Sequence, residues 1–264
     1  MEVFNKKPYI ITIVIFILIS LGLGGYIAYN YFVEKEDKVK VITMVDDVKI
    51  NLDAFYQVSD TLERFDLAFN KPNSKYLGYI YSKKIIKVKE FDENAALYSA
   101  MSKELISSNI NQTIVADKVN GNMESMFGIY LKYDNKTLDV NDKVKINYDS
   151  NTSTYSYTMP TNTANYSEGY VTKNVKTILK EDNIIVTRKV YYVEYNGTDS
   201  NTTRATIYTD ANKGHKLGEV KVKNGEASEK EVLAKYGTRL NTYDVTFTKN
   251  TDDDYTFNKI ERVR

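Results

Sequence analysis

The chain has 264 residues, a formal net charge of +1 at pH 7 and a hydrophobic fraction of 42%. This composition supports a packed core, and the balanced charge argues against a phosphate-tracking groove, so we expect no nucleic-acid partner. Cysteine is absent, which excludes disulfides, thiolate nucleophiles and cysteine-ligated metals. Abundant Lys, Asn, Ile and Tyr without Trp indicates a bacterium with an AT-rich genome.

Residues 8–33 contain no Asp, Glu, Lys or Arg. As a helix this segment is about 39 Å long at 1.5 Å per residue, which exceeds the ~30 Å hydrocarbon core of a bilayer. We therefore predict an uncleaved single-pass signal anchor in the cell membrane, with the lipid bilayer as its partner. A cleaved signal peptide is the alternative. Residues 1–7 would form a short cytoplasmic tail, because a long following domain translocates largely regardless of its charge.

Ser20, Gly24 and Ala28 recur every four residues along this predicted transmembrane helix. Small residues at that spacing let two helix backbones approach closely within a bilayer. We expect this face to pair two copies of the chain or to contact a partner membrane protein. The alternative is that the three residues only reflect how common small residues are in such helices.

A charged collar at 34–40 leads into a predicted extracytoplasmic α+β domain, helix-rich over 41–128 and an antiparallel meander over 129–264. Apolar residues recur every seven positions and predict a long first helix that ends at Asn70–Pro72: Val41, Val48, Phe55, Leu62, Phe69. Polar Ser59 and Asp66 interrupt the stripe, which favours packing on a sheet over a coiled-coil stalk. Asp92 is the predicted N-cap of a second helix over 93–107.

Strands are predicted at Tyr76–Tyr81 and Ile85–Val88, and hairpins follow in the meander. One joins residues 175–179 to 184–195, and another joins residues 243–247 to 255–257. Ser228 and Glu231 predict a capping box that begins a short helix ending at Gly237.

This order resembles the cone-shaped folds of nuclear-transport-factor-2-like and cystatin-like proteins, with Gly169–Val263 carrying most of the likeness. The whole layout also resembles uncharacterised single-pass, membrane-anchored extracytoplasmic proteins of low-GC bacteria. The resemblance implies an N-terminal transmembrane helix followed by helices packed on a curved antiparallel sheet. It further implies a pocket or strand edge that could bind something, and it transfers no functional residue.

No catalytic, cofactor or metal site is predicted. His215 is the only histidine and lies in a polar turn, so neither a zinc histidine pair nor a catalytic triad is supported. Asp210-x-Asn212-x-Gly214 approaches a calcium-loop spacing, but Lys221 stands where the closing acid belongs. Asp252–Asp254 is the other acidic turn, and turns favour Asp for backbone reasons alone.

We therefore expect a membrane-anchored extracytoplasmic binding or scaffolding protein, with a membrane protein or the cell wall as its partner. The alternative is a cell-wall-acting glycoside hydrolase that uses paired carboxylates. Asp46–Asp47 and Glu90–Asp92 are its most obvious acidic groups, and a sensor coupled through the transmembrane helix is a third hypothesis.

Overall fold

The computed structural model describes residues 52–106, 111–158, 168–180, 182–196, 204–223, 225–250 and 254–264. All of them belong to one compact unit, Ile42–Arg264. The strands in this part of the chain form two sheets, and the strand pairs within them are antiparallel.

The larger sheet has eight strands in the order β1 (Ile85–Lys87), β12 (Tyr255–Arg262), β11 (Asn241–Lys249), β7 (Asn183–Tyr195), β8 (Arg204–Tyr208), β9 (Lys216–Lys223) and β10 (Glu226–Ala227), with β6 (Glu168–Lys180) also pairing to β7. Strand β7 pairs with β6 on one side along its length. On its other side it pairs first with β11 and then, over its last four residues, with β8.

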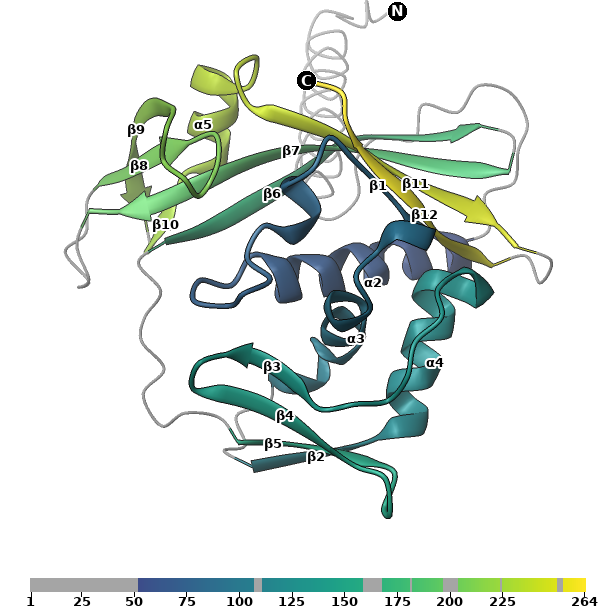
Figure 1. Ribbon diagram of the computed structural model, residues 1–264. Coiled ribbons are helices and arrows are strands. Elements are labelled where there is room, and N and C mark those ends of the chain that lie inside the picture. Colours follow the sequence, from purple (N-terminus) through teal and green to yellow (C-terminus); the bar gives the residue numbers. More distant parts are fainter. Residues whose placement is uncertain are drawn as a thin grey trace, which may run out of the picture. The chain divides into compact units, whose positions relative to one another are not determined.

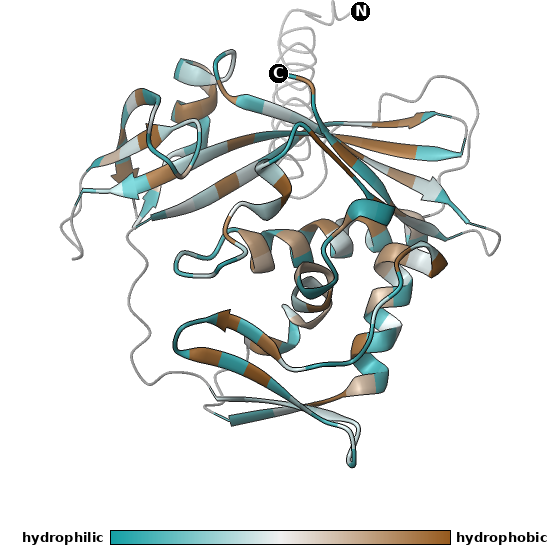
Figure 2. Cartoon of the chain, viewed as in Figure 1, coloured by the Kyte–Doolittle hydropathy of each residue, from teal (hydrophilic) through white to brown (hydrophobic). Residues whose placement is uncertain are grey.

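The smaller sheet has four strands in the order β2 (Asn111–Val115), β5 (Thr154–Thr158), β4 (Val144–Asp149) and β3 (Leu138–Asn141). Hydrophobic and hydrophilic residues alternate along β3 and β4, which places one face on the core and the other in solvent (Figure 2). Strand β2 comes from the segment expected to be rich in helices, whereas the other three strands of this sheet come from the predicted meander.

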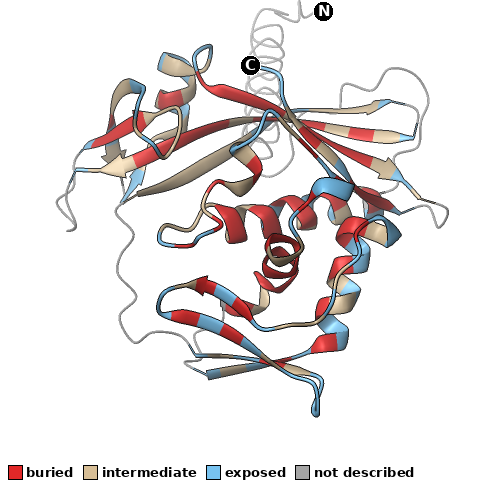
Figure 3. Cartoon of the chain, in the orientation of Figure 1, coloured by how far each residue is buried: buried red, intermediate tan, exposed pale blue. Residues whose placement is uncertain are grey.

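Helices α2 (Leu52–Phe69), α3 (Glu93–Met101) and α4 (Ala116–Phe127) lie between the two sheets (Figure 1). One hydrophobic cluster accordingly contains residues from all three layers, including Ile146, Phe65 and Val245. Helix α3 buries every residue from Ala95 to Met101, as Figure 3 shows. Its position at the centre of the core explains why it needs no polar face.

Helix α5 (Glu229–Tyr236) packs on the opposite face of the larger sheet. Successive side chains of a strand point to opposite faces of the sheet. Along β7, the side chains on the two faces accordingly belong to two different hydrophobic clusters. Val186 and Val190 join the main core, whereas Tyr191 and Val193 join a second cluster with Val232 of α5. The larger sheet is therefore covered on both faces at this end.

The predicted fold class is wrong. Its α+β character is correct, but the strands divide into two antiparallel sheets with helices between them, and do not form one curved sheet. Within the described ranges, no helix combines the length and the apolar character that a membrane crossing requires. The predicted tail at 1–7, transmembrane segment at 8–33 and collar at 34–40 lie outside the described residues.

Several local predictions are confirmed. The first helix ends at Phe69, and the Asp92 carboxylate accepts a hydrogen bond from the N–H of Ala95 at 2.9 Å as the N-cap of α3. Both hairpins form, with Phe247 opposite Phe257 in the second. Where the first helix begins lies outside the described residues.

Two local predictions need correction. The segment Tyr76–Tyr81 is not a strand, because Gly78 adopts a left-handed conformation (φ 64°) and the chain enters a 3-10 helix, η2 (Tyr79–Tyr81). Ser228 does cap α5 by accepting from the N–H of Glu231 at 3.4 Å. The Glu231 carboxylate, however, accepts from the N–H of Lys221 and so does not complete a capping box.

Candidate functional site

At one edge of the larger sheet, the first half of β12 has no outer strand partner among the described residues. Strand β1 pairs with Lys259–Glu261 and ends at Lys87, where the chain turns into a 3-10 helix, η3 (Val88–Glu90). Among the described residues, β11 is thus the only strand that pairs with β12 from Tyr255 to Asn258. Tyr255, Thr256 and Phe257 are nevertheless buried, because α4 and η3 pack against this stretch of β12.

Two pockets adjoin along this edge, and we call them together the edge groove. The first holds about 540 Å³ between η3 and β12 and includes Lys87, Lys89 and Phe257 in its lining. The second holds about 350 Å³ between α4 and the start of β12 and includes Gly121, Glu124 and Asp254 in its lining. Tyr130 and Thr256 line both pockets, so the two pockets lie next to each other.

Two exposed apolar residues of η5 (Gly128–Tyr130), the 3-10 turn after α4, line this groove: Tyr130 lines both pockets and Ile129 lines the second. Ile129 is 87% exposed and Tyr130 48% exposed. Gly128 places them there with φ 58° and ψ −155°, a conformation that is essentially restricted to glycine. A large apolar residue left in water forgoes about 2 kcal/mol of burial free energy, so this exposure calls for a reason.

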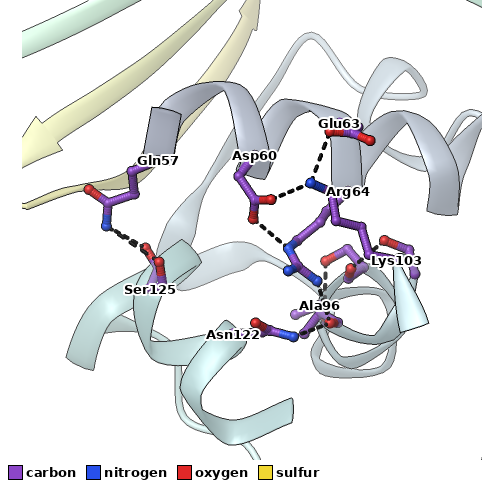
Figure 4. Close-up of polar contacts among 11 residues, drawn as sticks. Gln57, Asp60, Glu63, Arg64, Ala96, Lys103, Asn122 and Ser125 are labelled. Atoms are coloured by element: carbon purple, nitrogen blue, oxygen red, sulfur yellow. Dashed lines mark hydrogen bonds and ion pairs between the residues drawn. The ribbon is translucent and has the colours of Figure 1, made fainter. Parts of the chain in front are cut away.

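The floor of the second pocket is fixed by Gln57 of α2. Its side-chain amide donates to the backbone oxygen of Ser125 in α4 at 3.3 Å (Figure 4). Its amide oxygen accepts from the N–H of Tyr255 at 2.8 Å. One side chain thus connects α2, α4 and the start of β12, and it preorganises the groove.

A polar network behind the groove holds the three central helices together (Figure 4). The Asp60 carboxylate accepts from Arg64 Nε at 2.6 Å and from Lys103 Nζ. Arg64 and Asn122 both donate to the carbonyl of Ala100. Partial burial alone would raise the pKa of Asp60, but the hydrogen bonds from Lys103 and Arg64 outweigh it and hold the pKa below its usual value.

The most buried charged cluster is a structural tether. Arg188 of β7 is 2% exposed and donates to both carboxylate oxygens of Asp66 in α2, at 3.0 and 2.5 Å. It also donates to Asn174 and Thr172 of β6, which leaves little bonding capacity for a ligand. Burial raises the pKa of the neighbouring Tyr81, whose buried hydroxyl finds no hydrogen-bond partner among the described residues.

The residues considered from sequence fall elsewhere. His215 is exposed in the β8–β9 turn, and the Asp210 carboxylate accepts from Thr209 Oγ1 and the N–H of Asn212 in the same turn. Asp92 is committed to capping α3. In the described part of the chain, no three His, Cys, Asp or Glu residues gather in a way that could hold a metal ion.

The predicted association face, Ser20, Gly24 and Ala28, lies outside the described residues. The same is true of Asp46–Asp47 and of Asp252–Asp253, whereas Asp254 lines the edge groove. The roles expected of the undescribed residues stay predictions.

Sequence reasoning missed the central feature of the groove. The helix-rich part does end at Gly128, the C-cap of α4, but the predicted antiparallel meander begins at Ile129. No strand begins there: the next one is β3, at Leu138. The usable signal was an apolar pair directly after a helix-ending glycine and before the charged Lys132 and Asp134.

Comparison with known proteins adds no assignment: no family model, no curated protein and no solved structure matches this chain. The resemblance to the cone-shaped folds and to anchored extracytoplasmic proteins accordingly stays a prediction. Function must be argued from the groove itself.

Proposed function

We propose that this chain is a non-enzymatic binding or scaffolding protein whose partner docks in the edge groove. The observation that carries the proposal is Ile129, which is 87% exposed in the lining of the second pocket and follows a glycine-specific turn. Exposed apolar side chains beside a concave, preformed surface are typical of protein-interaction sites.

Photo-cross-linking in the native cells tests this proposal. A photoreactive residue at position 129 should yield a discrete protein adduct. The same residue at Val263, which is 53% exposed at the end of the chain, should not. Identical adduct patterns from both positions would contradict a dedicated docking site.

A groove-filling variant sharpens this test. Gly121 lines the second pocket and an added Cβ there would meet no atom within 4 Å, so Gly121→Trp is designed to fill this pocket, and circular dichroism checks that the fold is kept. The adduct from position 129 should then be lost. Gly214→Trp is the matched control, because Gly214 has equally open surroundings in the β8–β9 turn. An adduct that survives Gly121→Trp would remove the groove from the proposal.

One observation favours the glycoside hydrolase alternative: Glu124 and Asp254 line the same pocket. Such hydrolases need two carboxyl groups on either side of the scissile bond. Incubating the full-length chain with peptidoglycan fragments and weighing the products tests it. Turnover that Glu124→Gln abolishes would establish this alternative, whereas saturable binding without turnover would support the binding role.

The extracytoplasmic location rests on residues 8–33, outside the described part, and stays a prediction. Cell fractionation tests it directly. Recovery of the intact chain in the aqueous fraction, after ultracentrifugation without detergent, would contradict it.

A further inference from the structure

The two ends of the edge groove carry opposite charge. Lys87 and Lys89 are exposed at the first pocket, and neither forms an ion pair with any described residue. Glu90 lies at the same end, and its carboxylate accepts a long hydrogen bond (3.5 Å) from the N–H of Lys87. That end therefore keeps a net positive charge.

The second pocket has the opposite character. Glu124 of α4 and Asp254 at the start of β12 are both exposed there, and neither has an ion-pair partner in the described part of the chain. Unpaired charges of opposite sign thus lie at the two ends of the groove, with the exposed Ile129 and Tyr130 in its lining.

Gly121 gives independent support for a close partner. It lies in the middle of α4, where glycine costs about 0.8–1 kcal/mol relative to alanine. Nothing in the fold requires the missing side chain, since an added Cβ would meet open space. Glycine is the residue that lets another backbone approach a helix closely, and this glycine faces the second pocket.

The dimensions suit an extended segment. The groove follows β12 from Asp254 to Asn258, which is about 13 Å at ~3.3 Å per residue. An extended chain of four to five residues spans that length.

We propose that the edge groove binds an extended polypeptide segment of a partner protein, with a basic end, an apolar centre and an acidic end. The basic end lies at Glu124 and Asp254, the centre at Ile129 and Tyr130, and the acidic end at Lys87 and Lys89. This inference rests on the proposed binding function and specifies the chemistry of the partner.

Three labelled peptides with one shared centre, Thr-Val-Thr-Val, test the inference by fluorescence anisotropy on the full-length chain in mild detergent. One carries two lysines at one end and two glutamates at the other, one carries lysines at both ends, and one carries glutamates at both ends. The mixed peptide should bind about five- to tenfold more tightly than either uniform peptide at low salt. This preference should disappear in 1 M salt, where exposed charges are screened.

Charge-reversal variants make the test specific. The pair Lys87→Glu and Lys89→Glu should transfer the preference to the lysine-ended peptide. The pair Glu124→Lys and Asp254→Lys should transfer it to the glutamate-ended peptide. Because all four side chains are exposed, both pairs should leave the unfolding transition nearly unchanged, which circular dichroism checks.

Equal binding of the three peptides, no binding at millimolar concentration, or a preference that ignores both reversals would overturn the inference. Self-association that Gly121→Trp abolishes would also overturn it, since a second copy would then be the occupant. None of these results removes the adduct expected from position 129. Failure of the inference is therefore distinguishable from failure of the proposed function.

Discussion

Phe65 of α2 and Phe257 of β12 meet edge to face, with ring centroids 5.3 Å apart and ring planes at 88°. Both side chains are fully buried. The rings of Phe91 and Phe127 lie 5.8 and 6.0 Å from the Phe65 ring, so this one side chain links α2, the end of α4 and the sheet. Phe257 also lines the first pocket, and the aromatic cluster therefore supports the groove from beneath.

Phe65→Ala should lower the free energy of unfolding by about 3–5 kcal/mol, because it leaves a cavity among four aromatic rings. Urea unfolding followed by circular dichroism measures the loss. Tyr56→Ala on the same helix is the control: Tyr56 is 71% exposed, and its change should stay within about 0.5 kcal/mol. Equal losses for the two variants would contradict the central place of Phe65.

Asp66→Ala should cost about 3 kcal/mol, because it leaves the buried guanidinium of Arg188 without its counter-charge. Adding Arg188→Met to that variant should recover part of the loss, since an apolar side chain is then buried in place of an unpaired charge. Urea midpoints of the two variants make the comparison. A double variant less stable than Asp66→Ala would show that Arg188 is held mainly by Asn174 and Thr172.

Asp60 should make the free energy of unfolding depend on pH in the acid range. Its pKa is below the unfolded value, so its stabilisation is complete above about pH 4 and is lost as the pH falls further. Because the carboxylate is more than one third exposed and screened by water, Asp60→Asn should cost at most about 1 kcal/mol at pH 7. The difference from the unmodified chain should shrink towards pH 3. A difference that is constant across this range would exclude an electrostatic role.

Two glycines of the same helical segment should respond oppositely to alanine. Gly121→Ala should raise the free energy of unfolding by about 0.5–1 kcal/mol, because the position is helical and open. Gly128→Ala should lower it by about 1–3 kcal/mol, because φ is +58° there. Thermal unfolding of both variants provides the measurement. Stabilisation by Gly128→Ala would show that η5 can rearrange.

Elements whose signals are local were predictable. Asp92 three residues before Ala95 and the alternation around the β11–β12 turn each specify their structure within a few residues, and both are confirmed. The division of the strands into two sheets, in contrast, has no local signal in the sequence. Strand β2 finds its partner about forty residues away, with Ile114 opposite Tyr155, and nothing in Asn-Gln-Thr-Ile-Val selects that strand over others.

The groove could not be predicted from the sequence for a related reason. Lys87 lines one pocket of the groove, whereas Glu124 and Asp254 line the other, only because β1 stops short and α4 ends against β12. The buried pair of Asp66 and Arg188 was hidden in the same way, since Asp66 looked only like a polar defect in an apolar stripe. In both places the meaning of a residue comes from a partner distant in sequence.

The position of β7 between two hydrophobic clusters fixes its alignment with its neighbours. Slippage by a single residue would turn Val186 and Arg188 out of the main core. It would also withdraw Tyr191 and Val193 from contact with α5. A misaligned pairing of β7 would therefore lose buried contacts on both faces of the sheet at once. We expect such a misaligned β6–β7 hairpin to be unstable and to open again before the helices pack against the sheet.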